Sequence, residues 1–207
     1  MVITYLGKQF FKISQGSLTI AFNPISKDSK LSSRVSKFGS DIAFSTINHP
    51  DYNGFDMVSH GENIPFEINS PGDYEIKDIF VKGIMTETEL SEKKYINTIY
   101  ALSIEGISLC FLGAISNGKL STNVLEQIGS PDILFLSIGS GLLDSTVAYK
   151  LAVSLEPKII IPMDYDEKSL KAFLKEVGNE KIESIDKLTI KAKDLIGRES
   201  EVVVLSS

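Results

Sequence analysis

Two residues with metal-ligand chemistry, His49 and Asp51, lie two positions apart in the segment TINHPDYNG, which follows the strand-like run DIAFS. A polar turn at the end of a strand suits metal ligands, and both imidazole and carboxylate coordinate divalent ions. Asp51 is also the candidate catalytic residue of this turn. The alternative is structural, because a histidine can anchor a loop by hydrogen bonding and an Asp can accept from the N–H groups of its own turn.

A third candidate ligand, Asp164, follows the apolar run KIIIP. This run predicts a buried parallel strand, and the sites of α/β proteins gather at the carboxyl ends of such strands. With His49 and Asp51 it predicts a single-metal site that would accept Zn²⁺, Mn²⁺ or Mg²⁺, because oxygen ligands are in the majority. Alternatively, Asp164 and Asp166 cap the next helix.

A candidate ligand-binding loop, Gly139, Ser140 and Gly141, follows another buried strand. Its backbone amides could cradle a phosphate near the start of the next helix. The run lacks the GxxxxGK[ST] and GxGxxG layouts, so a plain loop is the alternative. His60, in the polar segment SHGEN, is expected to be an exposed loop residue rather than a ligand.

Composition excludes several classes of protein. The 207 residues carry a net charge of −6 and no Lys/Arg-rich run, which argues against nucleic acid as a partner. No apolar stretch is long enough for a membrane span and the N-terminus lacks a signal-peptide layout, so a cytoplasmic protein is expected. The lone Cys110 lies in the apolar run ISLCFLG and is expected to be a core residue.

The predicted elements change character near Gly113. Before it, short strands alternate with turns and predict a mostly antiparallel sheet, with a tight hairpin at Glu105-Gly106. After it, the runs DILFLSI and KIIIP flank a segment with helical spacing, which predicts a βαβ unit with parallel strands. Ser121 and Asp166 are expected to cap helices, and LTIKAKDL and EVVVL to close the chain as strands. The fold class is therefore α/β, in one domain over residues 1–207.

The order of these elements and several local motifs resemble the metallo-β-lactamase superfamily, and within it the branch of the ascorbate-phosphate lactonase. The motifs that carry the resemblance are ITYLGKQFFKI, TIAFNP, TINHPDYNG, PGDYEI, VKGI, FLGA and EPKIIIPMDY. The resemblance implies a four-layer αβ/βα sandwich with a metal site at one edge of two facing sheets.

The same resemblance implies that most metal ligands are missing. The family's His, His, Asp and His positions are occupied here by Ile47, His49, Asp51 and Tyr52. Its bridging Asp corresponds to Ala114, its last His to Asp164, and the early His of the lactonase branch to Lys8. A catalytic zinc needs about three protein ligands and one open position for water. The leading hypothesis is therefore a scaffold without the two-metal centre, holding no metal or one weakly bound ion.

Such a protein would act by binding a small molecule or a protein partner, and a homo-oligomer is also open. The rival hypothesis is a hydrolase with a rebuilt single-metal site acting on a phosphoester or a lactone. It requires the side chains of His49, Asp51 and Asp164 to converge on one ion.

Overall fold

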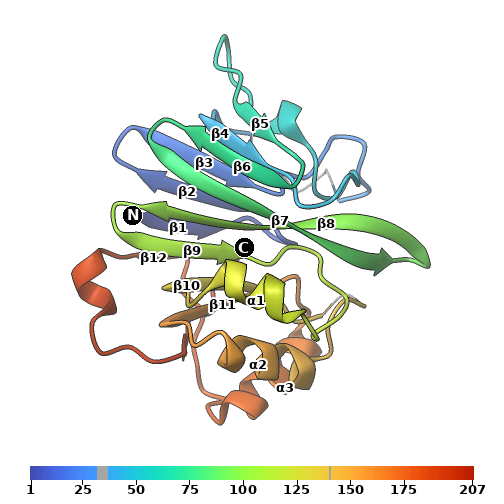
Figure 1. Cartoon of the computed structure of the whole chain (residues 1–207), viewed down its shortest axis with the longest axis vertical. Helices are drawn as coiled ribbons and strands as arrows, with labels where there is room; N and C mark the ends of the chain where they lie inside the picture. Colours follow the sequence, from blue (N-terminus) through green and yellow to red (C-terminus); the bar gives the residue numbers. More distant parts are fainter. Residues whose placement is uncertain (32–36, 140) are drawn as a thin grey trace.

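The computed structural model describes residues 1–31, 37–139 and 141–207 and contains two β-sheets packed face to face. Figure 1 shows the helices α1, α2 and α3 gathered on one side of this sandwich. The α/β class and the two facing sheets of the fold implied by the resemblance are confirmed, and the α-helices of the described residues cover one of the two outer faces.

The first sheet has six strands in the order β12-β1-β2-β3-β4-β5. Strands β1, β2 and β3 are antiparallel, whereas β3, β4 and β5 run parallel, so the sheet is more mixed than expected. The carboxyl ends of β3, β4 and β5 therefore meet at one edge. The strands are β1 (Val2–Tyr5), β2 (Phe11–Gln15), β3 (Leu18–Phe22), β4 (Ile42–Phe44), β5 (Phe66–Ile68) and β12 (Lys187–Thr189).

The second sheet has seven strands in the order β13-β11-β10-β9-β8-β7-β6. The predicted hairpin at Glu105-Gly106 joins β8 to β9, and the predicted parallel pairing of β10 with β11 is present. The hairpin of β7 and β8 extends well beyond the rest of the sheet (Figure 1). The strands are β6 (Gly72–Ile76), β7 (Ile79–Leu90), β8 (Lys93–Ile104), β9 (Ile107–Phe111), β10 (Ile133–Ser137), β11 (Ile159–Met163) and β13 (Glu201–Val202).

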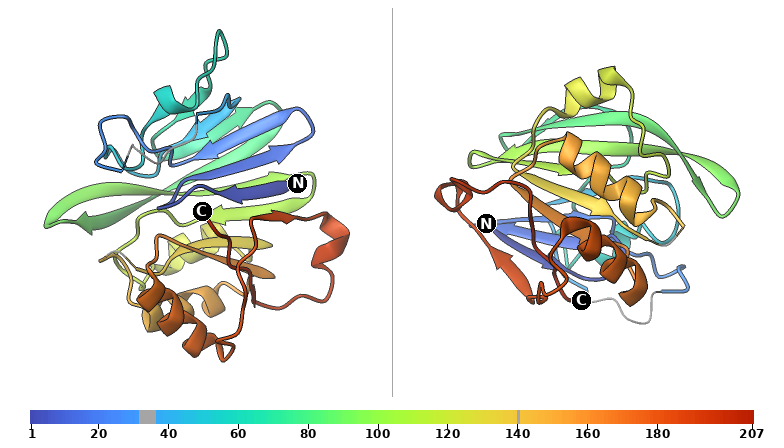
Figure 2. Two further views of the ribbon diagram at one scale, coloured as in Figure 1. Left: turned by 180° about the vertical axis from the view of Figure 1, so that it is seen from behind. Right: turned by 90° about the horizontal axis from the view of Figure 1, so that it is seen from below.

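The helices α1 (Thr122–Ile128), α2 (Ser145–Ser154) and α3 (Glu167–Val177) begin where short polar side chains accept hydrogen bonds from their first turns. The predicted caps Ser121 and Asp166 are confirmed at α1 and α3. Seen from below, α2 and α3 lie side by side (Figure 2). No helix among the described residues is long and apolar enough to cross a membrane.

The main core fills the space between the two sheets. Phe22 of the first sheet stacks on Phe111 of the second at 4.6 Å between ring centroids, and Phe11 meets Phe135 edge-on at 5.0 Å. A second cluster, which contains the buried Cys110, lies between the seven-stranded sheet and the helices. A third, smaller cluster covers the outer face of the six-stranded sheet.

Two strand predictions near the C-terminus were too long. Strand β12 covers Lys187–Thr189, so only Leu188 and Thr189 of LTIKAKDL belong to a strand, and Ala192–Leu195 forms the 3₁₀ helix η3. The Lys191 N–H donates to the Asp194 side chain at 2.9 Å, a local bond that competes with strand pairing. Within EVVVL only Glu201–Val202 forms a strand.

Candidate functional site

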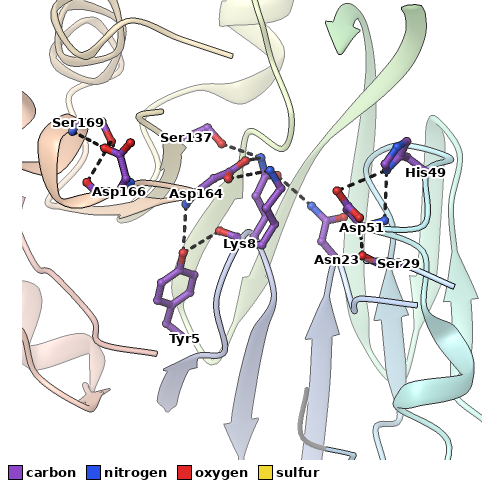
Figure 3. A network of polar contacts seen from close by, with 11 residues as sticks. Tyr5, Lys8, Asn23, Ser29, His49, Asp51, Ser137, Asp164, Asp166 and Ser169 are labelled. Carbon is purple, nitrogen blue, oxygen red and sulfur yellow. Dashed lines mark hydrogen bonds and ion pairs between the residues drawn. The ribbon is translucent and has the colours of Figure 1, made fainter. Parts of the chain in front are cut away.

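A buried ion pair lies where the turn after β1 meets the end of β11. Lys8 Nζ is 2.9 Å from Asp164 Oδ1, and the two side chains are 17% and 2% exposed. Asp164 directly follows β11 and Lys8 lies in the turn that joins β1 to β2. Figure 3 shows the Lys8 side chain reaching toward Asp164. The resemblance assigned both positions to metal ligands. In this chain they hold an ammonium and a carboxylate that form an ion pair with each other.

The second carboxylate oxygen of Asp164 belongs to a buried amide network. Gln9 Nε2 donates to Asp164 Oδ2 at 3.1 Å and to Ser137 Oγ at 2.6 Å. Gln9 Oε1 in turn accepts from Asn23 Nδ2 at 3.1 Å, and Asn23 Nδ2 also donates to Thr46 Oγ1 at 3.0 Å. The network thus joins residues at the ends of strands from both sheets, and it holds the Asp164 carboxylate in one orientation.

Three members of this site adopt the left-handed backbone conformation, which is uncommon for residues with a side chain. The φ angles are 57° for Lys8, 45° for Asn23 and 55° for Asp164. Tyr5 links two of them, because its hydroxyl donates to the Lys8 carbonyl at 2.8 Å and accepts from the Asp164 N–H at 3.2 Å. Strained backbone of this kind concentrates at functional sites and persists where surrounding contacts hold it.

His49 and Asp51 lie on a separate turn, the one containing TINHPDYNG (Figure 3). His49 Nδ1 accepts from the Asp51 N–H at 3.2 Å, and this nitrogen is 3.8 Å from Asp51 Oδ2. Asp51 Oδ1 accepts from Ser29 Oγ at 2.5 Å. One ring nitrogen of His49 and one oxygen of Asp51 therefore have hydrogen-bond partners inside the protein.

This turn is fastened to the segment after β3. The Ser26 N–H donates to the Pro50 carbonyl at 2.8 Å, and the Gly54 N–H donates to the Pro24 carbonyl at 2.7 Å. A Cβ atom on Gly54 would lie 2.4 Å from the backbone of Ile25, so no larger residue fits without displacing the chain. The glycine that ends TINHPDYNG therefore serves close backbone packing.

Three positions that the resemblance assigned to ligands form an apolar cluster. Ile47, Tyr52 and Ala114 pack with Leu142, and all four are buried. The Tyr52 hydroxyl is buried with no hydrogen-bond partner among the described residues, and burial raises the pKa of Tyr52 well above 10.0, with the Asp164 and Asp51 charges adding to the shift. Lys8 Nζ lies 5.6 Å from the centroid of the Tyr52 ring, within the range of a cation–π contact.

Two observations bear on whether the residues around Asp164 could hold a divalent metal ion. The Lys8 ammonium lies on the Asp164 carboxylate and would repel a second cation at that point. Within residues 1–31, 37–139 and 141–207, no group of three or more His, Cys, Asp or Glu side chains is arranged to hold a metal. The site predicted from His49, Asp51 and Asp164 stays a prediction that needs a measurement of metal content.

The predicted phosphate loop is only partly described, because Ser140 lies outside the described residues. A Cβ atom on Gly139 would lie 2.7 Å from Ser169 Oγ and 3.0 Å from the Asp164 carbonyl, so this glycine allows close packing against the start of α3. Gly141 has a φ of 77°. Ligand binding by this loop stays a prediction.

Sequence reasoning missed Gln9 and Asn23, which connect the site across the two sheets. A weak signal exists, since GKQ and NP are polar interruptions at the ends of apolar strand runs. Their partners lie far away in sequence, and Gln9 and Asp164 are 155 positions apart. No local spacing rule could have paired them.

Comparison with known proteins identifies the family and the fold of this chain. A family model described as a beta-lactamase superfamily domain matches residues 2–164. No curated protein matches the sequence. A solved structure from Thermotoga maritima, a candidate Zn-dependent hydrolase of the metallo-β-lactamase superfamily, has a TM-score of 0.78 and 25% identity, and the match covers 99% of this chain and 97% of that one.

Two more distant structures share the fold. A candidate metal-dependent hydrolase from Parabacteroides distasonis has a TM-score of 0.65 at 16% identity, covering 99% of this chain and 93% of its own. A metallo-beta-lactamase fold protein from Bacillus subtilis has a TM-score of 0.61 at 9% identity, covering 100% and 96%. Because the family model spans most of the chain, from β1 to the Asp164 turn, the protein belongs to the metallo-β-lactamase superfamily.

Proposed function

We propose that this protein is a non-hydrolytic member of its superfamily that works by binding a small molecule or a protein. The observation that carries the proposal is the ion pair between Lys8 Nζ and Asp164 Oδ1 at 2.9 Å. A fixed ammonium supplies positive charge next to a carboxylate, as a metal ion does. It offers no open coordination position and cannot lower the pKa of a bound water as a metal does.

The apolar cluster supports the proposal independently. Ile47 and Ala114 have no donor atoms, and the neutral Tyr52 hydroxyl is a poor ligand whose raised pKa keeps it neutral at physiological pH. Packing these side chains against Leu142 fills volume with carbon, which favours a dry cluster over a hydrated ion. A hydrolytic centre needs about three protein ligands and an exchangeable water.

Metal content is the direct test. The full chain, purified without chelator and dialysed with excess Zn²⁺ or Mn²⁺, is analysed by elemental mass spectrometry. We expect metal at background level and no hydrolysis of bis-p-nitrophenyl phosphate or of a simple lactone. About one tightly bound ion per chain, with hydrolysis, would overturn the proposal.

The two histidines of the chain provide a matched pair of variants for this test. His60 is exposed and His49 is half-buried in the TINHPDYNG turn. A metal lost in both His49→Ala and Asp164→Asn but kept in His60→Ala would assign the ion to the rebuilt single-metal site and favour the hydrolase.

A further inference from the structure

A polar cavity of about 390 Å³ opens at the carboxyl ends of β4 and β5, on the outer face of the six-stranded sheet. Ala43 belongs to the cluster on that face, and its partner on β5 is Glu67, which projects to the same side. Because side chains alternate along a strand, Ser45, two residues after Ala43, projects to this side too. The lining residues are Ser45, Asn48, Asn53, Phe55, Glu67 and Asn69. Two of them, Asn48 and Asn53, come from the TINHPDYNG turn but take no part in the ion-pair site.

The walls of this cavity are held in place before any ligand binds. The buried Tyr100 hydroxyl contacts the Ser45 carbonyl at 3.1 Å and the Ile68 carbonyl at 3.2 Å, which ties the ends of β4 and β5 together. Asn53 Nδ2 donates to Asn48 Oδ1 at 2.9 Å, and Gly54 packs tightly against the Ile25 backbone. Such preorganisation lowers the entropy lost on binding.

The lining chemistry discriminates between classes of ligand. Each of the three asparagines carries both donor and acceptor groups, which suits hydroxyl groups because a hydroxyl also donates and accepts. The Glu67 carboxylate is acceptor-only, and none of the described residues that line the cavity is cationic, so phosphates and carboxylates are disfavoured. The half-buried Phe55 adds one apolar surface, against which the C–H face of a sugar ring can pack.

We propose that this cavity binds a neutral polyhydroxylated molecule, a monosaccharide or one ring of a longer glycan. The volume lies at the small end of the range typical of ligand pockets. In this arrangement Glu67 accepts from hydroxyls of the ligand, and the Asn48–Asn53 pair supplies the remaining donors and acceptors. The inference goes beyond the proposed function and does not depend on whether the ion-pair site holds a metal.

The test is an NMR titration of the full, ¹⁵N-labelled chain with D-glucose, D-galactose and D-ribose, with inorganic phosphate as the anionic comparison. We expect saturable shifts of the side-chain amide signals of Asn48, Asn53 and Asn69 with at least one sugar, and none with phosphate. Non-saturating shifts with all three sugars, or saturable shifts confined to other residues, would overturn the proposal. Stronger binding of phosphate at these amides would do so too.

Two charge-matched variants locate the site. Glu67→Gln removes the acceptor-only carboxylate and should weaken sugar binding roughly tenfold, the equivalent of about 1.4 kcal/mol. Glu199→Gln makes the same change at an exposed residue that does not line the cavity and should leave the affinity unchanged. Equal effects of the two variants would contradict the assignment. The sugar titration tests this cavity and the metal analysis tests the proposed function. A negative result in one experiment therefore leaves the other proposal standing.

Discussion

The ion pair of Lys8 with Asp164 is shielded from water, most strongly at the carboxylate. Breaking a buried pair by removing one partner leaves an uncompensated charge, which typically costs about 3 kcal/mol or more. We therefore expect Lys8→Met to lower the free energy of unfolding by about 3 kcal/mol. In an Asp164→Asn background the same change should cost about 1 kcal/mol or less, because no buried charge remains.

Urea denaturation of the two single variants and the double variant measures this coupling. Asn suits position 164 because it tolerates the left-handed backbone found there. The exposed pair of Lys27 with Asp56, 3.9 Å apart, is the control, and Lys27→Met should leave stability unchanged. Additive effects of Lys8→Met and Asp164→Asn would show that the pair is not energetically coupled.

The Tyr52 hydroxyl is expected to destabilise the folded state. It is buried without a partner among the described residues, whereas the Tyr100 hydroxyl bonds to two carbonyl oxygens. An unpaired buried polar group costs about 1–3 kcal/mol. Tyr52→Phe should therefore raise the free energy of unfolding by about 1 kcal/mol, and Tyr100→Phe should lower it by a similar amount. A loss of stability in Tyr52→Phe would instead indicate that its hydroxyl has a bound partner, such as ordered water.

The same tyrosine gives a dependence on pH. Burial raises the pKa of Tyr52 above its ordinary value of 10.0, so the folded state keeps the phenol proton more tightly than the unfolded chain does. Above pH 10 the unfolded chain loses this proton while the folded state retains it, so the free energy of unfolding declines as the pH rises. Stability curves between pH 8 and about 11.5 should fall less steeply for Tyr52→Phe than for the wild type. Parallel curves would contradict the raised pKa.

At the scale of elements, Asp132 fixes the starts of three parallel strands. Its Oδ2 accepts from the Ser108 N–H at 2.8 Å, its Oδ1 is 2.7 Å from Lys158 Nζ, and its carbonyl accepts from the N–H groups of Lys158 and Ile159. Burial alone would raise the pKa of Asp132, but the bonds from Lys158 and Ser108 outweigh it and hold the pKa below 3.8. The residue thereby aligns β9, β10 and β11.

We expect Asp132→Ala to lower the free energy of unfolding by about 2 kcal/mol at pH 7, the typical contribution of hydrogen bonds to a charged group. Because the folded-state pKa is depressed, this contribution is present above pH 3.8 and is lost as the pH falls through the folded-state value. The variant and the wild type should therefore converge in acid denaturation. Lys158→Met should cost less than Asp132→Ala, since that side chain is 46% exposed.

Elements with strong local signals could be predicted from the sequence. Ser121 and Asp166 cap helices because their short side chains reach N–H groups within the first turn, and Glu105-Gly106 turns because both residues take positive φ. The parallel pairing of β3, β4 and β5 could not be predicted, because the described parts of their connections contain no α-helix of the kind that signals a crossover. The 3₁₀ turn at Ala192–Leu195 depends on one side-chain bond that strand periodicity does not reveal.

At the scale of the whole molecule, the candidate site is assembled from turns that are distant in sequence. The resemblance indicated which positions had lost ligands, but it could not show that Lys8 is paired with Asp164 or that Ile47, Tyr52 and Ala114 pack with Leu142. Both facts depend on how the two sheets face each other. Side-chain contacts across a sandwich have no sequence period, so they appear only once the fold is known.

The two sheets share one core, so they are expected to unfold together. Phe22 of β3 stacks on Phe111 of β9, and Phe11 of β2 meets Phe135 of β10, so neither sheet keeps its buried face without the other. The expected single domain over residues 1–207 should therefore unfold in one cooperative step. Phe22→Leu, with an expected cost of about 2 kcal/mol, should lower amide protection equally in both sheets.

Hydrogen exchange followed by mass spectrometry resolves peptides from each sheet and measures this directly. Val58→Ala is the comparison, because Val58 lies in the cluster on the outer face of the six-stranded sheet, away from the shared core. Under one cooperative transition, the most protected amides of β2, β3, β9 and β10 lose the same protection free energy in each variant. Loss confined to β2 and β3 in Phe22→Leu would show that the first sheet opens alone. The chain would then contain two cooperative units, despite the stacked rings of Phe22 and Phe111 between them.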